Sequence, residues 1–161
     1  MPAALPRTLA LVRIAVGLLF ILFGQFKVMG SEFVHQMVPG YVEQSVHEGQ
    51  AVGFYKAFLA RVVLPNAELF GYLVAWGELL LGLALVIGLW VRAASLLGAL
   101  HMLSLTLASW HAPGADAPLW QYFANQLSHL PLLLLFVIFF AGRAGEVWGL
   151  DAALRRSPKP K

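Results

Sequence analysis

The sequence predicts an all-α fold, namely an integral membrane four-helix bundle with a short interfacial helix in its first outer loop. The chain is 60% hydrophobic and 12% charged, whereas about a quarter of the residues in a soluble domain are charged. Its mean hydropathy is +0.75. Four of its segments approach the length of about 20 apolar residues that crosses a bilayer as a helix. A chain of 161 residues suits a single membrane domain surrounded by lipid.

Turn and capping residues mark where the predicted spans begin and end. Pro65 and Asn66 precede the second span, Gly88 follows it, and Asp116 with Pro118 precedes the fourth. The first span is too long for a signal peptide and lacks a small-residue cleavage site, so we expect it to stay in the protein. The predicted spans are residues 9–29, 69–87, 91–110 and 119–141, with an outer loop at 31–68 and a cytoplasmic tail at 142–161.

The distribution of positive charge predicts the orientation. Eight of the eleven Lys and Arg residues flank the spans on the side of the two termini, and such an excess marks the cytoplasmic side. We therefore expect a multi-pass protein of the cell (inner) membrane with both termini cytoplasmic. Arg13 and Arg92 are expected to anchor this topology by extending to the cytoplasmic interface. The eight residues are Arg7, Arg13, Arg92, Arg143, Arg155, Arg156, Lys159 and Lys161.

The outer loop contains the expected interfacial helix. Residues 53–63 read GFYKAFLARVV, in which Phe54, Phe58 and Val62 recur at helical spacing. Lys56 lies away from this apolar face, and such an arrangement favours a helix lying in the membrane interface. The pair Pro39-Gly40 predicts a turn before it.

Each predicted span carries one narrow stripe of small and polar residues at alternating spacings of three and four. Small residues at such spacing allow helices to pack closely in lipid, and polar residues face the bundle interior. Close packing explains the glycines, but it does not explain the ionisable residues. The stripes are Arg13, Gly17, Phe20, Gly24 and Lys27; Gly71, Ala75, Glu78 and Gly82; Ala94, Gly98, His101 and Ala108; and Asn125, His129 and Leu132.

The ionisable residues on these stripes predict a polar cavity in the outer half of the bundle. A charge at mid-bilayer costs several kcal/mol, so Glu78 is either protonated or paired with Lys27 or a histidine. At a rise of about 1.5 Å per residue, Glu78, His101 and His129 lie at depths from which they can converge. Under the alternative, a neutral Glu78 only fixes helix packing and each histidine only bonds across helices.

Several classes of protein are excluded by missing features. The chain has no cysteine, which excludes disulfides, thiol catalysis and Cys-ligated iron–sulfur clusters. It lacks a nucleophile elbow, a Walker loop, zinc-ligand spacing and a dinucleotide fingerprint. No basic cluster is interleaved with aromatic residues, so nucleic acid is not an expected partner. We predict no metal site.

Three motifs resemble one known family. The first is Arg13, Gly17, Gly24 and Lys27 in the spacing R-x3-G-x6-G-x2-K; the second is WGELLLGLALVIGLWVRAA at 76–94; the third is FAGRAGEVWGLD at 140–151. Together they resemble the DoxX/DoxD family of small four-helix membrane proteins, over nearly the whole chain. The third motif is more similar to the DoxD type, the membrane subunit of thiosulfate:quinone oxidoreductase.

The resemblance implies a membrane subunit of a quinone-linked oxidoreductase. It implies functional roles for Glu78, Arg92 and Lys27, while the two histidines come from the residues alone. Without cysteine, sulfur chemistry would belong to an extracytoplasmic partner subunit, leaving quinone contact and proton handling to this chain. The expected proton-transfer residues are then Glu78, His101 and His129, and the expected quinone-binding residues Lys27, Arg92, Asn125 and Ser128.

Two other functions fit the same sequence. One is a non-catalytic scaffold that anchors a soluble oxidoreductase through the outer loop. The other is a b-type haem protein with His101 and His129 as axial ligands. We rank the haem protein last, because the predicted depths of the two histidines differ too much to hold one haem.

The charge asymmetry leads to a prediction about labelling. A cysteine introduced at Ser45 should react with a membrane-impermeant maleimide added to intact cells, because the loop 31–68 is expected to lie outside. The unchanged chain has no cysteine and serves as the unlabelled control. Labelling that requires the cytoplasmic side to be opened would reverse the orientation.

Overall fold

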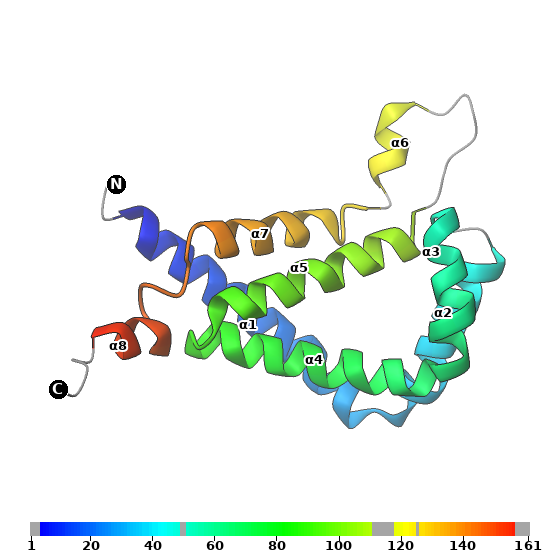
Figure 1. Ribbon diagram of the computed structural model, residues 1–161, viewed down its shortest axis with the longest axis horizontal. Helices are drawn as coiled ribbons and strands as arrows, with labels where there is room; N and C mark the ends of the chain where they lie inside the picture. Colours follow the sequence, from blue (N-terminus) through cyan, green and yellow to red (C-terminus); the bar gives the residue numbers. More distant parts are fainter. Residues whose placement is uncertain (1–3, 49–50, 111–117, 125, 157–161) are drawn as a thin grey trace.

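Helices make up the fold, and the described residues contain no strand. The computed structural model describes residues 4–48, 51–110, 118–124 and 126–156 (Figure 1). The all-α prediction is therefore confirmed. The α-helices are α1 (Ala4–Met29), α2 (Val38–His47), α3 (Gly53–Phe58), α4 (Ala67–Ile87), α5 (Val91–Ala108), α6 (Leu119–Ala124), α7 (Leu130–Ala141) and α8 (Leu150–Arg156); the π-helical and 3-10 turns are η1 (Phe33–Met37), η2 (Leu59–Val63) and η3 (Leu64–Asn66).

Within the described residues, three helical runs are long and apolar enough to cross a membrane. They are Leu5–Met29, Gly53–Ile87, which contains α4, and Val91–Ala108, and the shorter apolar helix α7 accompanies them. This confirms a multi-pass membrane bundle. In Figure 1, α2 and α3 lie across one end of the bundle, here called the loop end, while α8 lies at the opposite tail end, where α1 also begins.

Glycines allow α1 and α4 to pack at close range. A Cβ added at Gly82 would lie 2.7 Å from the backbone nitrogen of Ile21 and 2.8 Å from the carbonyl oxygen of Gly17. A Cβ at Gly24 would lie 2.7 Å from the backbone nitrogen of Leu79. The small-residue stripes of these two helices therefore face each other, as their spacing predicted.

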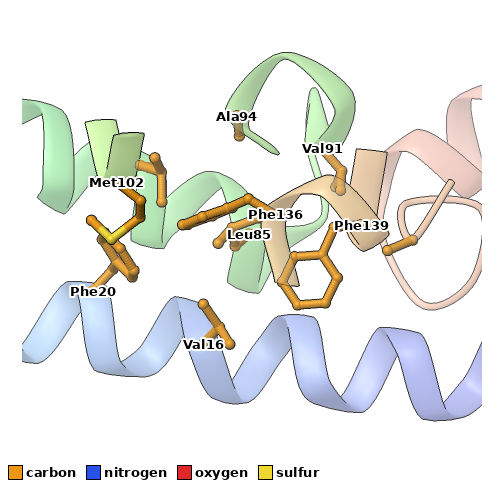
Figure 2. Packing of buried hydrophobic residues seen from close by; sticks show 10 residues of the cluster. Val16, Phe20, Leu85, Val91, Ala94, Met102, Phe136 and Phe139 are labelled. Atoms are coloured by element: carbon orange, nitrogen blue, oxygen red, sulfur yellow. The ribbon is translucent and has the colours of Figure 1, made fainter. Parts of the chain in front are cut away.

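A second contact region joins this helix pair to α5 and α7. The ring of Phe136 meets the ring of Phe20 edge-on, with 5.4 Å between their centroids. The same ring lies over Gly98, where an added Cβ would come within 2.5 Å of it. Figure 2 shows Phe136 at the centre of the apolar cluster, with Leu85 and Met102 beside it. One aromatic residue thus closes the core between the two helix pairs.

Arg13 lies inside the protein, and the prediction that it extends to the interface is wrong. Its side chain is fully buried. Its Nη1 atom donates to the carbonyl oxygen of Ala144 at 2.9 Å, and its Nη2 atom donates to that of Trp148 at 2.6 Å. These carbonyls belong to the segment after α7, which folds back over the tail end. The guanidinium therefore holds this segment against the bundle.

The same segment also caps α5. The Asp151 carboxylate accepts hydrogen bonds from the backbone N–H groups of Trp90 and Val91, both at 2.9 Å. An aspartate in this position satisfies donors that the first helical turn leaves unpaired. Gly88, with φ +71°, ends α4 in the left-handed conformation, and its Cα lies against Gly149. The α4–α5 turn and the tail therefore fold as one unit.

The loop end differs from its prediction in two ways. Pro39 and Gly40 form no separate turn, because Pro39 occupies the first turn of α2, where its missing N–H is not needed. The expected helix at residues 53–63 is present as α3 and η2, but it continues through η3 directly into α4.

The structure also changes the position for the maleimide labelling experiment. Ser45 is 1% exposed, so the cysteine is better introduced at the exposed Glu43.

The predicted fourth span is not one continuous helix. The structure has two separate helices, with α6 at a steep angle to α7 in Figure 1. Pro131 lies in the first turn of α7; inside a longer helix it would remove a hydrogen bond and clash with the preceding turn. The 12 residues of α7 extend about 18 Å, short of the hydrocarbon thickness of about 30 Å.

The packing of α4 against α1 leads to a prediction for two glycines of one helix. Gly82→Ala should lower the free energy of unfolding in detergent by about 1–3 kcal/mol, which is the usual cost of overpacking a close contact. The melting temperature should fall with it. The matched control is Gly77→Ala, because an added Cβ there meets nothing within 4 Å and alanine is the better helix former. Equal melting temperatures for the two variants would contradict the packing described.

Candidate functional site

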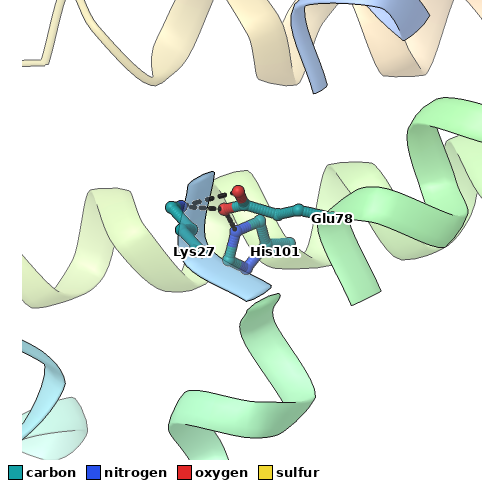
Figure 3. A network of polar contacts seen from close by, with 3 residues as sticks. All are labelled: Lys27, Glu78 and His101. Atoms are coloured by element: carbon teal, nitrogen blue, oxygen red, sulfur yellow. Dashed lines mark hydrogen bonds and ion pairs between the residues drawn. The ribbon is translucent and has the colours of Figure 1, made fainter. Parts of the chain in front are cut away.

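A buried ion pair lies toward the loop end of the bundle. The side chain of Glu78, on α4, is 7% exposed. Lys27, near the end of α1, donates from Nζ to both carboxylate oxygens, at 2.7 Å to Oε1 and 2.6 Å to Oε2 (Figure 3). The same Nζ lies 5.0 Å from the centroid of the Phe33 ring. The carboxylate thus has a cation within direct contact, which offsets the cost of burial.

His101 completes the network from α5. Its Nε2 atom lies 2.9 Å from Glu78 Oε1, and its side chain is 19% exposed. Lys27, Glu78 and His101, here called the polar network, come from three different membrane-spanning segments. The stripes predicted this convergence, and of the two expected states of Glu78 the structure shows the paired one. The network also fixes the depth of α1, α4 and α5 relative to one another.

The polar network lies at the edge of a large cavity. The cavity has a volume of about 940 Å³ and is bounded by α1, the loop-end helices, α4, α5 and the start of α7. Its walls are mainly apolar and include Phe33, Met37, Phe58, Leu59, Phe70 and Val74. An apolar enclosure with a few convergent polar groups is the usual form of a small-molecule site.

The predicted site residues of α7 and its preceding turn lie at different places. His129 lines the cavity, half-buried at the start of α7, with Nδ1 3.4 Å from Ser128 Oγ. Ser128 itself is exposed and does not line the cavity. Asn125 is outside the described residues. Of the two described residues of this group, His129 lies at the cavity.

Arg92 lies away from the polar network, although the family resemblance implies a functional role for it together with Glu78 and Lys27. It precedes His101 by nine residues on α5, which is about 14 Å along the helix. Its guanidinium lies 4.6 Å from the centroid of the Phe140 ring at the tail end. The side chain is exposed, in keeping with the anchoring role expected from its charge.

The sequence did not identify two tyrosines that line the cavity. Tyr41 of α2 and Tyr55 of α3 both face it, and the Tyr55 hydroxyl is hydrogen-bonded to Ser104 Oγ. Burial raises the pKa of the Tyr41 phenol, so this group remains a hydrogen-bond donor around neutral pH. The interpretation of residues 53–63 as an interfacial helix hides the signal of Tyr55, and no pattern in the sequence marks Tyr41 as part of a cavity wall. Among the described residues, no three His, Asp or Glu side chains gather to hold a metal.

Comparison with known proteins identifies one family. The DoxX family model matches residues 8–111, which is more than half of the chain. The matched region contains all three residues of the polar network and most of the cavity wall, and it ends before α7. No curated protein and no solved structure matches the chain.

The burial of the ion pair leads to a prediction about energetic coupling. Lys27→Met and Glu78→Gln should each lower the free energy of unfolding. The double variant should lose less than the sum of the two single losses, and this difference, the coupling energy, should be about 0.5–3 kcal/mol. Arg155 and Glu146 form the matched control, because they are also 2.6 Å apart but 56% and 41% exposed. Their coupling should not exceed about 1 kcal/mol. Additive losses at Lys27 and Glu78 would mean that their contact stabilises nothing.

Proposed function

The chain belongs to the DoxX family, and we propose that it is the quinone-binding membrane subunit of an oxidoreductase. One observation carries this proposal: a buried Glu78, bound by Lys27 and His101, lies at the edge of a largely apolar cavity. A quinone has the matching character, because its ring and tail are apolar and its polarity is confined to the carbonyl oxygens.

The size of the cavity supports a ligand of this class. Small-molecule sites usually enclose about 300–1,000 Å³, and this cavity measures about 940 Å³. Aromatic side chains such as Phe33, Phe58 and Phe70 give it flat apolar surfaces. Such walls accommodate a ring, while the polar network offers hydrogen bonds to one of its oxygens.

The polar network also suits the proton chemistry of a quinone. Reduction to the quinol takes two electrons and two protons. The electrons come from an extracytoplasmic partner subunit, which in the DoxD-like case oxidises thiosulfate. His101, as the imidazolium, donates one proton to the carbonyl oxygen beside it and is then reprotonated from solvent, while the other carbonyl oxygen takes its proton from solvent. Glu78 stabilises the imidazolium, as a carboxylate hydrogen-bonded to a histidine does in other enzymes.

The membrane orientation enters this proposal through the charge distribution. The tail end carries the excess of Lys and Arg residues, so we assign it to the cytoplasmic side of the inner membrane. The cavity then lies toward the outer leaflet, near the extracytoplasmic partner.

Haem is the less suitable ligand, because ligation through His101 Nε2 would break its hydrogen bond to Glu78.

A scaffold without catalytic activity is the second candidate. It is favoured by the two contacts of Glu78. A carboxylate that binds Lys27 and His101 at the same time also holds the three helices that carry these residues in register. Under this alternative, the carboxylate contributes only to assembly, and the loop end anchors the partner oxidoreductase.

Replacing Glu78 distinguishes the two functions. Glu78→Gln keeps the shape of the side chain but cannot stabilise an imidazolium with a negative charge. In the complex isolated from native membranes with its electron donor, quinone reduction should fall by about 10²- to 10⁴-fold, the scale of a proton-transfer group. Glu146→Gln, an exposed position at the tail end, should leave the rate unchanged. A folded Glu78→Gln complex with full activity would support the scaffold, for which Glu78→Leu should instead impair assembly.

A further inference from the structure

Ser104 differs from the other hydroxyl residues of α5 and of its C-cap, Ser109. The hydroxyls of Ser95, Thr106 and Ser109 donate to the backbone carbonyl four residues earlier, at 2.7, 2.8 and 2.8 Å. Hydroxyls in helices commonly satisfy themselves in this way. Ser104 instead bonds across the cavity wall to the hydroxyl of Tyr55. Both residues line the cavity, so this pair presents hydroxyl groups to whatever the cavity holds.

The position of Tyr55 is fixed by its surroundings. The backbone N–H of Val52, directly before α3, donates to the carbonyl oxygen of Leu107 at 3.0 Å. This bond ties the start of α3 to the last turn of α5. The ring of Tyr55 also packs on the ring of Phe58, with 5.4 Å between centroids. Tyr55 is therefore held against α5 before any ligand arrives.

Counting hydrogens shows that the pair has bonding capacity left over. Each hydroxyl has one proton and two lone pairs. The bond between Tyr55 and Ser104 uses one proton, whichever atom donates it. The other proton remains to donate to a carbonyl oxygen, and the unused lone pairs remain to accept from an O–H group. The pair thus suits both a quinone and the quinol formed from it.

The pair and the polar network stand one helical turn apart. Ser104 follows His101 by three residues on α5, a rise of about 4.5 Å, and both line the same cavity. A ligand with two oxygen atoms on one ring can therefore meet both groups of this cavity, whereas a ligand with a single oxygen can meet one of them.

We propose that the Tyr55–Ser104 pair is a second binding point, which holds the carbonyl oxygen opposite the one at His101. This inference rests on the proposed function and specifies its substrate class: the cavity selects quinones, with two oxygens on one ring, over ligands with one oxygen. The neutral pair contributes affinity and orientation; His101 protonates the oxygen at the polar network, and the oxygen at the pair takes its proton from solvent.

Binding to the full-length chain in lipid nanodiscs tests the second point. The probes are menadione, a para-naphthoquinone, and alpha-tetralone, which has a similar bicyclic frame with a single carbonyl oxygen. Tyr55→Phe and Ser104→Ala should each weaken menadione binding about 2- to 10-fold, the scale of one lost neutral hydrogen bond. Neither change should alter the weaker binding of alpha-tetralone, whose one oxygen is held at His101.

Matched variants separate the failure of this inference from that of the proposed function. Tyr72→Phe, on an exposed face of α4, and Ser95→Ala, toward the tail end, should leave the affinity for menadione unchanged. If the unaltered chain binds no menadione, both proposals are wrong. If menadione binding is weakened by Glu78→Gln but not by Ser104→Ala, which removes a single oxygen atom, the quinone site stands and the second binding point is wrong.

Discussion

A carboxylate buried among membrane-spanning helices must be paired, and the rest of this structure depends on how Glu78 meets that requirement. Lys27 and His101 approach its two oxygens from α1 and α5. An unpaired charge at this depth would cost several kcal/mol, so the three helices are held at the one relative depth that brings these side chains together. The same contacts place a charged group at the edge of an otherwise apolar cavity.

The remaining features of the bundle support that arrangement. Gly17, Gly24 and Gly82 let α1 approach α4 closely enough for Lys27 to reach its partner. The interior between the polar network and the tail end is apolar and closed by Phe136. A second buried charge, Arg13, donates at the tail end from both terminal nitrogens to carbonyls of the returning segment. The two buried charged side chains of the described residues, Arg13 and Glu78, thus lie at separate places, one structural and one at the cavity.

Local periodicity explains which parts were predictable. The alternating spacing of small and polar residues depends on helix geometry alone, so it identified the inward faces of three helices and the polar network. Contacts between distant segments were not predictable in this way. The burial of Arg13 requires carbonyls more than a hundred residues away, and Tyr55 meets α5 only because the loop folds back over the bundle. The apolar pattern predicts one span over residues 119–141, but the folded chain separates α6 from α7.

The central claim is that the cavity beside the polar network is where a quinone binds, and photochemical labelling tests it most directly. An azido-quinone is irradiated with the chain in lipid nanodiscs, and the modified residues are identified by mass spectrometry with and without excess menadione. We predict menadione-sensitive labels on cavity residues of η1, α3 and the loop-end half of α5, such as Phe33, Tyr55 and Ser104. Labels confined to exposed residues such as Phe26 and Leu97, unaffected by menadione, would contradict the claim.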